Sequence, residues 1–469
     1  MKKKLIALAS LLAAAGLAGC GGKKTGGEIS LWVGAESVEF YQQATKEYID
    51  AHPEFGYSVN VIAADTGTAG GQMLADNTQC GDIVTIAHDN IGKLAQKTLV
   101  KPLTNASLLA QIEADNPDEY KTVIRSKVGD SPDKYVIGSP YISQALFLMY
   151  NKDYVSEEQA KTFEGLKEAA IAARTTLGKS DVNGCTLTGT DGFNFSFTLL
   201  ARKSEDNSTT LKIYEGLDKA NTWCQGDDTV AVARWGQRTF ADGTLIWPND
   251  SGHATMMQTG TALSVIGGAW HYNAVKAAIG EAKVGISLIP EFTLTAEDVA
   301  GTTMAPGTKM RGGTFADCKC FVINAASDAS KYDAEQELIK YLSSKDLQNK
   351  SFKACTNVPA YKNAMEYIET VKNEVSAGAY AIAKAQTSMV QYGIAQPFVT
   401  ATLNNYYYQA GGPDLYKNLL MLDGTAEDAS LRHTKEVLYT MNYIWMFGNG
   451  TVDKMEIPEV LPAVPVKAQ

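Results

Sequence analysis

The alternation of short apolar strands with helices in the first hundred residues constrains the fold more than any other feature of this sequence. The predicted strands are 29–33, 59–63 and 82–87, and the predicted helices are 36–51, 68–76 and 90–96. Strands that alternate with helices in this way form a parallel sheet through right-handed crossovers. Because such sheets bind ligands beyond the carboxyl ends of their strands, we expect functional side chains directly after these three strands.

Those strand ends carry the polar and aromatic candidates Trp32, Glu36, Asp65 and Asp89. A pyranose ring presents hydroxyl groups at its rim and an apolar C–H face, so a sugar site needs carboxylate acceptors and flat aromatic rings. Asp89 has a second interpretation as the N-cap of the helix that follows it, and both roles can hold together. We interpret His88 as a packed, hydrogen-bonded histidine rather than as a ligand-binding residue.

A second candidate region is the stretch 255–272. Its apolar residues 262–266 predict a strand, and Gly267 and Gly268 follow, where the backbone can take a positive φ or approach a ligand closely. Trp270 and Tyr272 come directly afterwards and would place flat rings at a cleft wall. Tryptophan is nevertheless highly buried on average, so a core position for Trp270 stays an open alternative.

The length of 469 residues predicts two or three compact units, because one ordinary core does not grow to that size. Residues 135–150 predict two short strands around Pro140, and Ser156 is predicted to cap a helix that runs to Ala173. The segments 183–190 and 291–313 are predicted to be connections without regular structure.

Phe193, Phe195 and Phe197 alternate with the period of a strand and are predicted to lie in the core. The remaining predicted elements are a strand at 318–324 and helices at 212–224, 231–242, 332–343, 360–386 and beyond Pro397.

The first twenty residues predict an exported, lipid-modified protein. Three lysines precede an apolar run at 5–17 that is too short for an ordinary membrane span, and the run ends in Leu17-Ala18-Gly19-Cys20. This ending resembles a bacterial lipobox, which implies removal of residues 1–19 and lipid attachment to Cys20. Residues 20–27 then form a flexible, glycine-rich tether, and no later stretch is predicted to span a membrane.

Several other functions are disfavoured. The formal charge of −10, without a basic cluster beyond the leader, argues against nucleic-acid binding. Cys318 and Cys320 lack partners at zinc spacing, so we predict packed thiols or one bridge to Cys355, with no metal and no cofactor. The segment 175–180 ends like a phosphate loop, but Ala173 replaces its first glycine. We therefore predict that the protein is not an enzyme.

Five stretches together resemble a known family. They are 29–36, 81–99, 140–153, 260–270 and 322–327. In order and spacing they are similar to the extracellular solute-binding proteins of carbohydrate ABC importers, and most similar to the maltose/maltodextrin-binding branch. The likeness extends over 29–445, nearly the whole mature chain.

The resemblance implies an α/β fold of the two-lobe periplasmic-binding-protein type (type II), in which each lobe is a mainly parallel sheet flanked by helices. It implies that the ligand cleft lies between the lobes. We expect lobe one at 28–139 with 320–357, lobe two at 140–319 with 358–457, and a tail at 458–469.

The resemblance also assigns roles at matching positions. Trp32 and Glu36 match sugar-contacting positions, Asp89 matches a carboxylate that binds sugar hydroxyls, and Trp270 matches a stacking aromatic. Gln144 stands where many relatives have an acidic ligand. Two departures concern the identity of the sugar: Asn90 replaces a basic residue, and around 397–408 three tyrosines are present instead of a tryptophan.

The implied function is that of a monomeric receptor, lipid-anchored at the outer face of the cytoplasmic membrane. It would bind maltose or a maltodextrin by hinge closure and deliver it to the permease of an ABC importer. One alternative is a receptor for another oligosaccharide or a polyol. A second alternative is a surface glycoside hydrolase, because the paired carboxylates of such enzymes meet only in space.

Overall fold

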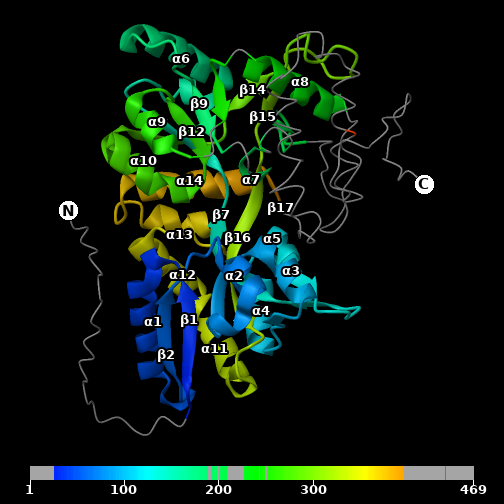
Figure 1. Ribbon diagram of the computed structural model, residues 1–469, viewed down its shortest axis with the longest axis vertical. Helices are drawn as coiled ribbons and strands as arrows, with labels where there is room; N and C mark the ends of the chain where they lie inside the picture. The colour runs from blue at the N-terminus through cyan, green and yellow to red at the C-terminus, as the bar shows by residue number, and fades with distance from the viewer. Residues whose placement is uncertain are drawn as a thin grey trace, which may run out of the picture.

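A computed structural model describes residues 26–188, 192–195, 197, 200–208, 227–241, 243–248, 251–395 and 439. It contains two lobes stacked along the long axis (Figure 1), which we call the lower and the upper lobe, and each has its own hydrophobic core. The predicted helices at 212–224 and beyond Pro397, the leader and Cys20 lie outside the described residues. Within the described part of the chain, no helix is long and apolar enough to span a bilayer.

The lower lobe contains the parallel strands predicted from the sequence. They are β1 (Glu28–Val33), β2 (Ser58–Ala63) and β3 (Ile83–Ala87), paired in the order β3-β1-β2. The predicted helices α1 (Val38–Ala51), α2 (Ala69–Asp76) and α3 (Ile91–Gln96) follow these strands. Asp89 is not the cap of α3, because Asn90 occupies that position, so this interpretation was wrong.

The rest of the lower lobe surrounds this sheet. It comprises β4 (Val100–Lys101), α4 (Ala106–Asp115), α5 (Asp118–Val123), β5 (Arg125–Lys127), β6 (Lys134–Val136), α11 (Tyr332–Leu342) and α12 (Lys345–Cys355). Helix α11 buries the apolar stripe Leu338, Ile339 and Leu342, while acidic residues occupy its first turn, where the helix dipole favours negative charge.

The upper lobe has a mixed sheet in the order β11-β9-β12-β8-β13, because β8 runs antiparallel to β12 and β13. Its strands are β8 (Phe147–Asn151), β9 (Cys185–Leu187), β11 (Ile246–Pro248), β12 (Ser264–Gly267) and β13 (Val284–Ser287). The helices are α6 (Phe163–Leu177), α7 (Gly192–Phe195), α8 (Asp227–Ala241), α9 (His253–Thr259), α10 (Tyr272–Ile279), α13 (Ala364–Thr370) and α14 (Ala377–Val390).

Three local predictions need correction. The segment 183–190 contains β9, and 291–313 contains β14 (Glu291–Thr293) and β15 (Lys309–Arg311), which pair with each other and with β10 (Arg202–Lys203). Thr162 caps α6, whereas the Ser156 hydroxyl accepts a hydrogen bond from Gln159 N–H in the turn before it. These strands are so short that their pairing depends on distant partners, which local sequence does not reveal.

For two members of the phenylalanine repeat the predicted core position is confirmed, but the predicted element was wrong. Phe193 and Phe197 are buried, and Phe193 belongs to the short helix α7 rather than to a strand. Pro140 does not separate two strands but lies inside β7 (Gly138–Gln144). There it faces Cys320 at a shift in register, the kind of irregularity at which a strand tolerates proline.

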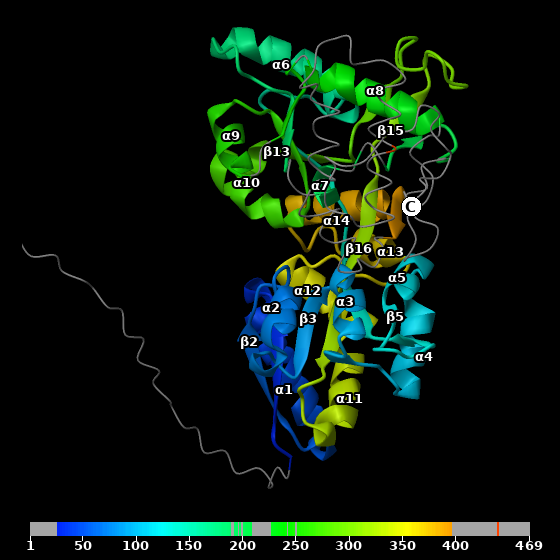
Figure 2. The same cartoon turned by 45° about the vertical axis from the view of Figure 1, so that its right-hand side comes forward.

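The lobes are joined by β7 and by the long strand β16 (Thr314–Asn324), which pair antiparallel, and β16 can be followed from one lobe into the other in Figure 2. Phe315 at the start of β16 packs in the upper core, whereas Phe321 packs in the lower core. A third connection passes beside β7, where Ser143 N–H donates to the Val358 carbonyl at 2.8 Å. Strand β17 (Gly393–Ala395) pairs with the start of β16. We call the region in which β7, β16, β17 and the segment at Val358 run between the lobes the lobe junction.

Candidate ligand-binding site

The carboxyl ends of the three parallel strands bring acidic side chains to the lobe junction. Glu36 lies in the single turn Ala35–Ser37 after β1, Asp65 follows β2, and Asp89 lies in the turn His88–Asn90 after β3. Glu36 and Asp65 are exposed and Asp89 is partly exposed. Turn geometry orients two of them: Asp65 Oδ1 accepts the Gly67 N–H at 2.8 Å, and Asp89 Oδ1 accepts from Asn90 Nδ2 at 2.8 Å.

Lys319 is a functional candidate that the sequence reasoning missed. It lies on β16 opposite Ala87, the last residue of β3, and its ammonium group forms no hydrogen bond or ion pair with any described residue. Burial lowers the pKa of Lys319, while the carboxylates of Glu36, Asp317 and Asp65 act in the opposite direction. The available signal in the sequence was a lysine among the apolar residues and thiols of 318–323.

A buried polar pair, His88 and Asp317, connects the end of β3 to β16. His88 is fully buried as predicted, and its Nδ1 is hydrogen-bonded to Asp317 Oδ1. Asp317 in turn pairs across the strands with Gln144, the last residue of β7, which is also buried. Gln144 therefore lies next to the carboxylate-bearing residue Asp317, but as a buried cross-strand partner and not as an exposed side chain.

The upper lobe contributes an exposed aromatic ring. Trp270 lies in the turn Ala269–His271 after β12, and 46% of its surface is exposed, so the core interpretation of this residue was wrong. Its ring centroid is 6.0 Å from that of Phe193, which is 5.8 Å from that of Phe315 on β16. This chain of rings links Trp270 to the strand that carries Lys319.

The glycine before Trp270 allows close approach rather than an unusual backbone angle. Gly268 has φ −96°, which any residue can adopt, but a Cβ there would lie 2.1 Å from Trp270 Cζ3. The indole can fold back over the turn only because position 268 has no side chain.

Two further candidates are placed away from this site. Tyr272 is only 8% exposed, packs in the upper core, and donates from its hydroxyl to Glu281 at 3.3 Å. Trp32 is partly buried against the lower core, and its ring packs on Gly81, at the end of β3 opposite the junction. Neither ring is available at the carboxylate edge, so we assign both residues to packing.

The described cysteines are free thiols, and the sulfur atoms of Cys318 and Cys320 lie 3.6 Å apart, within hydrogen-bond distance but without a disulfide bond. This agrees with the packed-thiol alternative, although the two sulfurs are closer than the sequence suggested. Burial raises the pKa of the Cys318 thiol well above its usual value, which keeps it protonated. Among the described residues, no group of three His, Cys, Asp or Glu side chains is placed to hold a metal.

Comparison with solved structures identifies proteins of the same fold. The maltodextrin-binding protein MalE1 from L. casei BL23, without ligand, is 17% identical, with a TM-score of 0.66 over 88% of this chain and 97% of that chain. The maltose-binding protein MalE from Listeria monocytogenes, in complex with maltose, is 18% identical, with a TM-score of 0.61 over 89% and 98%. MalX from Streptococcus pneumoniae, in complex with maltopentaose, is 18% identical, with a TM-score of 0.61 over 87% and 99%.

At these identities the solved structures establish the two-lobe α/β fold, which confirms the predicted fold class. A comparison with curated proteins finds no match. In a comparison with protein families, residues 43–379 match the bacterial extracellular solute-binding proteins, which are binding receptors rather than enzymes. Because this match covers well over half of the sequence, the chain belongs to the bacterial extracellular solute-binding protein family and resembles the maltodextrin-binding receptors of ABC importers.

Proposed function

We propose that this protein is a receptor for maltose or a short maltodextrin, which it binds at the lobe junction and delivers to the permease of an ABC importer. One observation carries the proposal: an exposed indole of the upper lobe and a group of carboxylates of the lower lobe are linked through the same strand, β16. Stacking rings and hydroxyl acceptors are the two requirements of a sugar site.

In the proposed complex, Trp270 stacks on the apolar face of one sugar ring. Glu36, Asp65 and Asp89 accept hydrogen bonds from hydroxyl groups, and Lys319 donates to a hydroxyl oxygen. Gln144 holds the Asp317 strand pair in register rather than replacing an acidic ligand. Since the rings and the carboxylates belong to different lobes, closure of the lobes would complete the site, a motion for which hinged receptors are known.

The test is calorimetric titration of the purified protein with maltose, maltotriose, other oligosaccharides and polyols. We expect one of the maltose series to bind stoichiometrically and without hydrolysis. Trp270→Ala should weaken that binding by about 30- to 150-fold, while the melting temperature of the unligated protein stays unchanged. Tight binding of an unrelated sugar or a polyol would show that this compound, and not maltose, is the ligand. Unchanged affinity of the Trp270→Ala variant would show that Trp270 does not contact the ligand.

We further propose that acyl chains on Cys20 hold the receptor at the outer face of the cytoplasmic membrane. Each buried CH₂ group contributes about 0.8 kcal/mol to such anchoring. The variant Cys20→Ser should release the protein into the soluble fraction after a salt wash. A variant that still sediments with membranes would contradict the proposed anchor.

A further inference from the structure

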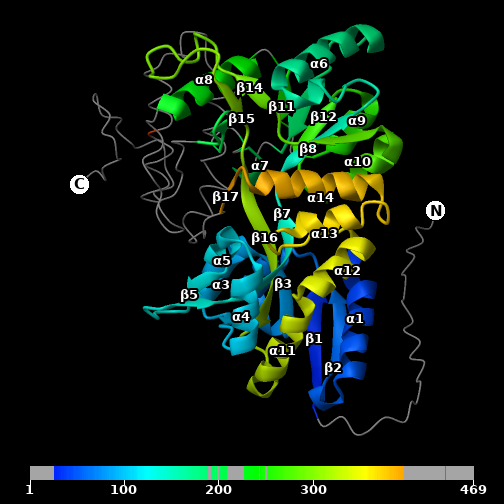
Figure 3. The same cartoon turned by 180° about the vertical axis from the view of Figure 1, so that it is seen from behind.

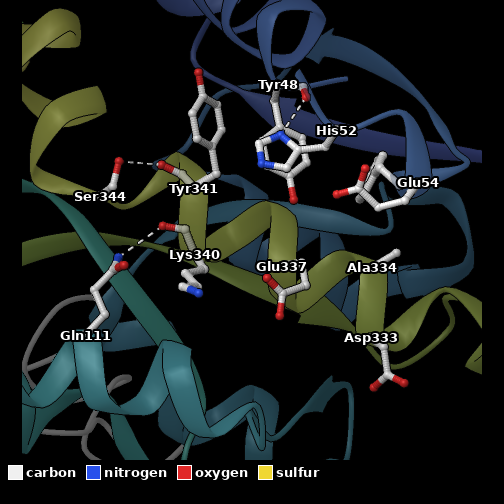
Figure 4. Close-up of a pocket in the computed structure, with 11 residues that line it drawn as sticks. Tyr48, His52, Glu54, Gln111, Asp333, Ala334, Glu337, Lys340, Tyr341 and Ser344 are labelled. Carbon is white, nitrogen blue, oxygen red and sulfur yellow. Dashed lines mark hydrogen bonds between the residues drawn. The ribbon is translucent and has the colours of Figure 1, made fainter. Parts of the chain in front are cut away.

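A cavity lies outside the proposed sugar site, between the end of α1 and α11 (Figure 4), and both helices lie on the side of the lower lobe that is seen in Figure 3. Its volume is about 560 Å³, within the range of small-molecule sites. Helix α1 starts two residues after Glu36, and the cavity is lined by its residue Tyr48 and by His52, which directly follows the helix. At ~1.5 Å per residue, roughly 15–20 Å of helix separate the cavity from the lobe junction. We call this cavity the α1–α11 pocket.

Aromatic rings form one wall of the α1–α11 pocket. The Tyr48 ring stacks on His52 with centroids 4.3 Å apart and planes 28° apart. It also packs against Tyr341 at 4.8 Å and 30°, which connects the two helices through their rings. His52 is fixed by a 2.9 Å hydrogen bond between its Nδ1 and the Tyr48 carbonyl (Figure 4). Tyr48 itself is only 8% exposed, so the accessible part of this wall is formed by the partly exposed rings of His52 and Tyr341.

Three residues with carboxylates, Glu54, Asp333 and Glu337, line the cavity together with one lysine, Lys340. Glu337 accepts a hydrogen bond from Asn105 Nδ2 at 2.6 Å. The side chains of Glu54, Asp333 and Lys340 form no hydrogen bond or ion pair with the described residues. Burial, with the charges of Glu337 and Glu54, raises the pKa of Tyr48 to about 12, so the ring stays neutral beside these carboxylates.

We propose that the α1–α11 pocket is a second ligand site, separate from the sugar site, that binds an organic ammonium group. The excess of carboxylates is complementary to a positive charge, and ring faces attract cations through their quadrupole. A neutral sugar would gain the ring contacts but would leave the excess negative charge uncompensated. The aromatic wall selects an alkylammonium rather than a strongly hydrated metal ion.

The test compares choline with its neutral carbon isostere, 3,3-dimethylbutan-1-ol, by calorimetric titration of the full-length Cys20→Ser protein. The two probes have the same shape, so a difference in affinity reports the charge. We expect choline to bind about 10- to 30-fold more tightly than the isostere. Equal affinity for the two probes, no binding of choline, or displacement of choline by a sugar bound at the junction would overturn the proposal.

Substitutions then assign the binding to this pocket. The double change Glu54→Gln and Glu337→Gln should weaken choline binding by about fivefold or more without changing the affinity for the sugar. Glu39→Gln is the matched control, because Glu39 lies on the same helix, in its first turn and outside the pocket. Choline binding that is unaffected by the double change, or equally affected by the control, would place choline elsewhere and refute the assignment.

The ammonium group could belong to a free small molecule or to a lipid headgroup, and one further experiment distinguishes the two. The Cys20→Ser protein is sedimented with phosphatidylcholine vesicles, with the Glu54→Gln, Glu337→Gln variant as control. Sedimentation that depends on the two glutamates supports a lipid headgroup, whereas choline binding without sedimentation supports a free amine.

Discussion

At the lobe junction, the lower lobe presents carboxylates and Lys319, whereas the upper lobe presents the exposed indole of Trp270. The lower edge follows from fold geometry, because three parallel strands end side by side and each continues into a polar turn. The position of the Trp270 ring depends instead on a single local feature, because Gly268 has no side chain and leaves space for the indole. The comparison shows that neither lobe alone contains both the stacking ring and the hydroxyl acceptors of the proposed sugar site.

The lobes also differ in the ionisable groups that they bury. In the upper lobe, burial and the neighbouring His253 lower the pKa of His271 to about 4. In the lower lobe, burial raises the pKa of Glu335 to about 7, and one of its carboxyl oxygens lacks a partner among the described residues. Burial thus disfavours protonation of His271 and ionisation of Glu335. As the pH rises, the contribution of His271 to the free energy of unfolding should increase and that of Glu335 should decrease.

The largest expected effect concerns His271. Its folded pKa of about 4 lies below the unfolded value of about 6.5, so the unfolded chain takes up the proton first as the pH falls. Stability contributed by neutral His271 is present above pH ~6.5 and is lost toward pH ~4, by up to about 3 kcal/mol. Urea unfolding across this range should show a smaller loss for His271→Gln than for the wild type, and equal losses would show that the histidine ring is solvated.

Glu335 should act in the opposite sense. Its folded pKa of about 7 lies above the unfolded value of about 4.5, so the folded chain holds its proton longer as the pH rises. Stability is therefore lost between pH ~4.5 and pH ~7, by about 2–3 kcal/mol. Glu335→Gln should gain stability relative to the wild type over this interval in the same unfolding assay. If the free energies of unfolding of the two proteins differ by the same amount at every pH, Glu335 does not titrate as proposed and the contrast between the lobes is contradicted.

Removal of the Lys319 charge tests the lower edge of the site. Lys319→Met eliminates a hydrogen-bond donor and leaves the nearby carboxylates uncompensated, so affinity for a neutral sugar should fall by about 10- to 30-fold. Lys309→Met is the matched control, because Lys309 is exposed on β15 in the upper lobe. Titration calorimetry of both variants separates the two cases, and an equal effect would indicate a general charge effect.

The smallest effect is expected for Asp89→Asn, which preserves shape and removes one charged acceptor. Loss of a charge-assisted hydrogen bond to a sugar hydroxyl should weaken binding by about 3- to 10-fold. Asp50→Asn serves as the control, because Asp50 is exposed and its only described partner is Lys46. Unchanged binding by Asp89→Asn would restrict the acceptors to Glu36 and Asp65.

The sequence predicted the parallel strands β1, β2 and β3 well because each of them is bounded locally and is followed by its own helix. It failed for β9, β14 and β15, which have three residues each and depend on partners far away in sequence. The environment of Lys319 was equally hidden, since Glu36 and Asp65 come from two segments far away in the sequence. Trp270 was ambiguous because residue type favours burial, and only the missing side chain at Gly268 allows its exposed position.

Strand β16 also determines when the protein can finish folding. The hydrogen bond between His88 and Asp317 joins residues 229 positions apart, and β16 pairs with β3, which like the parallel strands β1 and β2 precedes the strands of the upper lobe. At ~5–20 residues per second, a ribosome needs roughly 10–45 s to synthesise that interval. During this time the edge of β3 has no partner, so the nascent chain stays open to chaperones and to transport in an unfolded form. Because β16 ends at Asn324, the first lobe cannot complete its sheet until more than two thirds of the 469 residues have been synthesised.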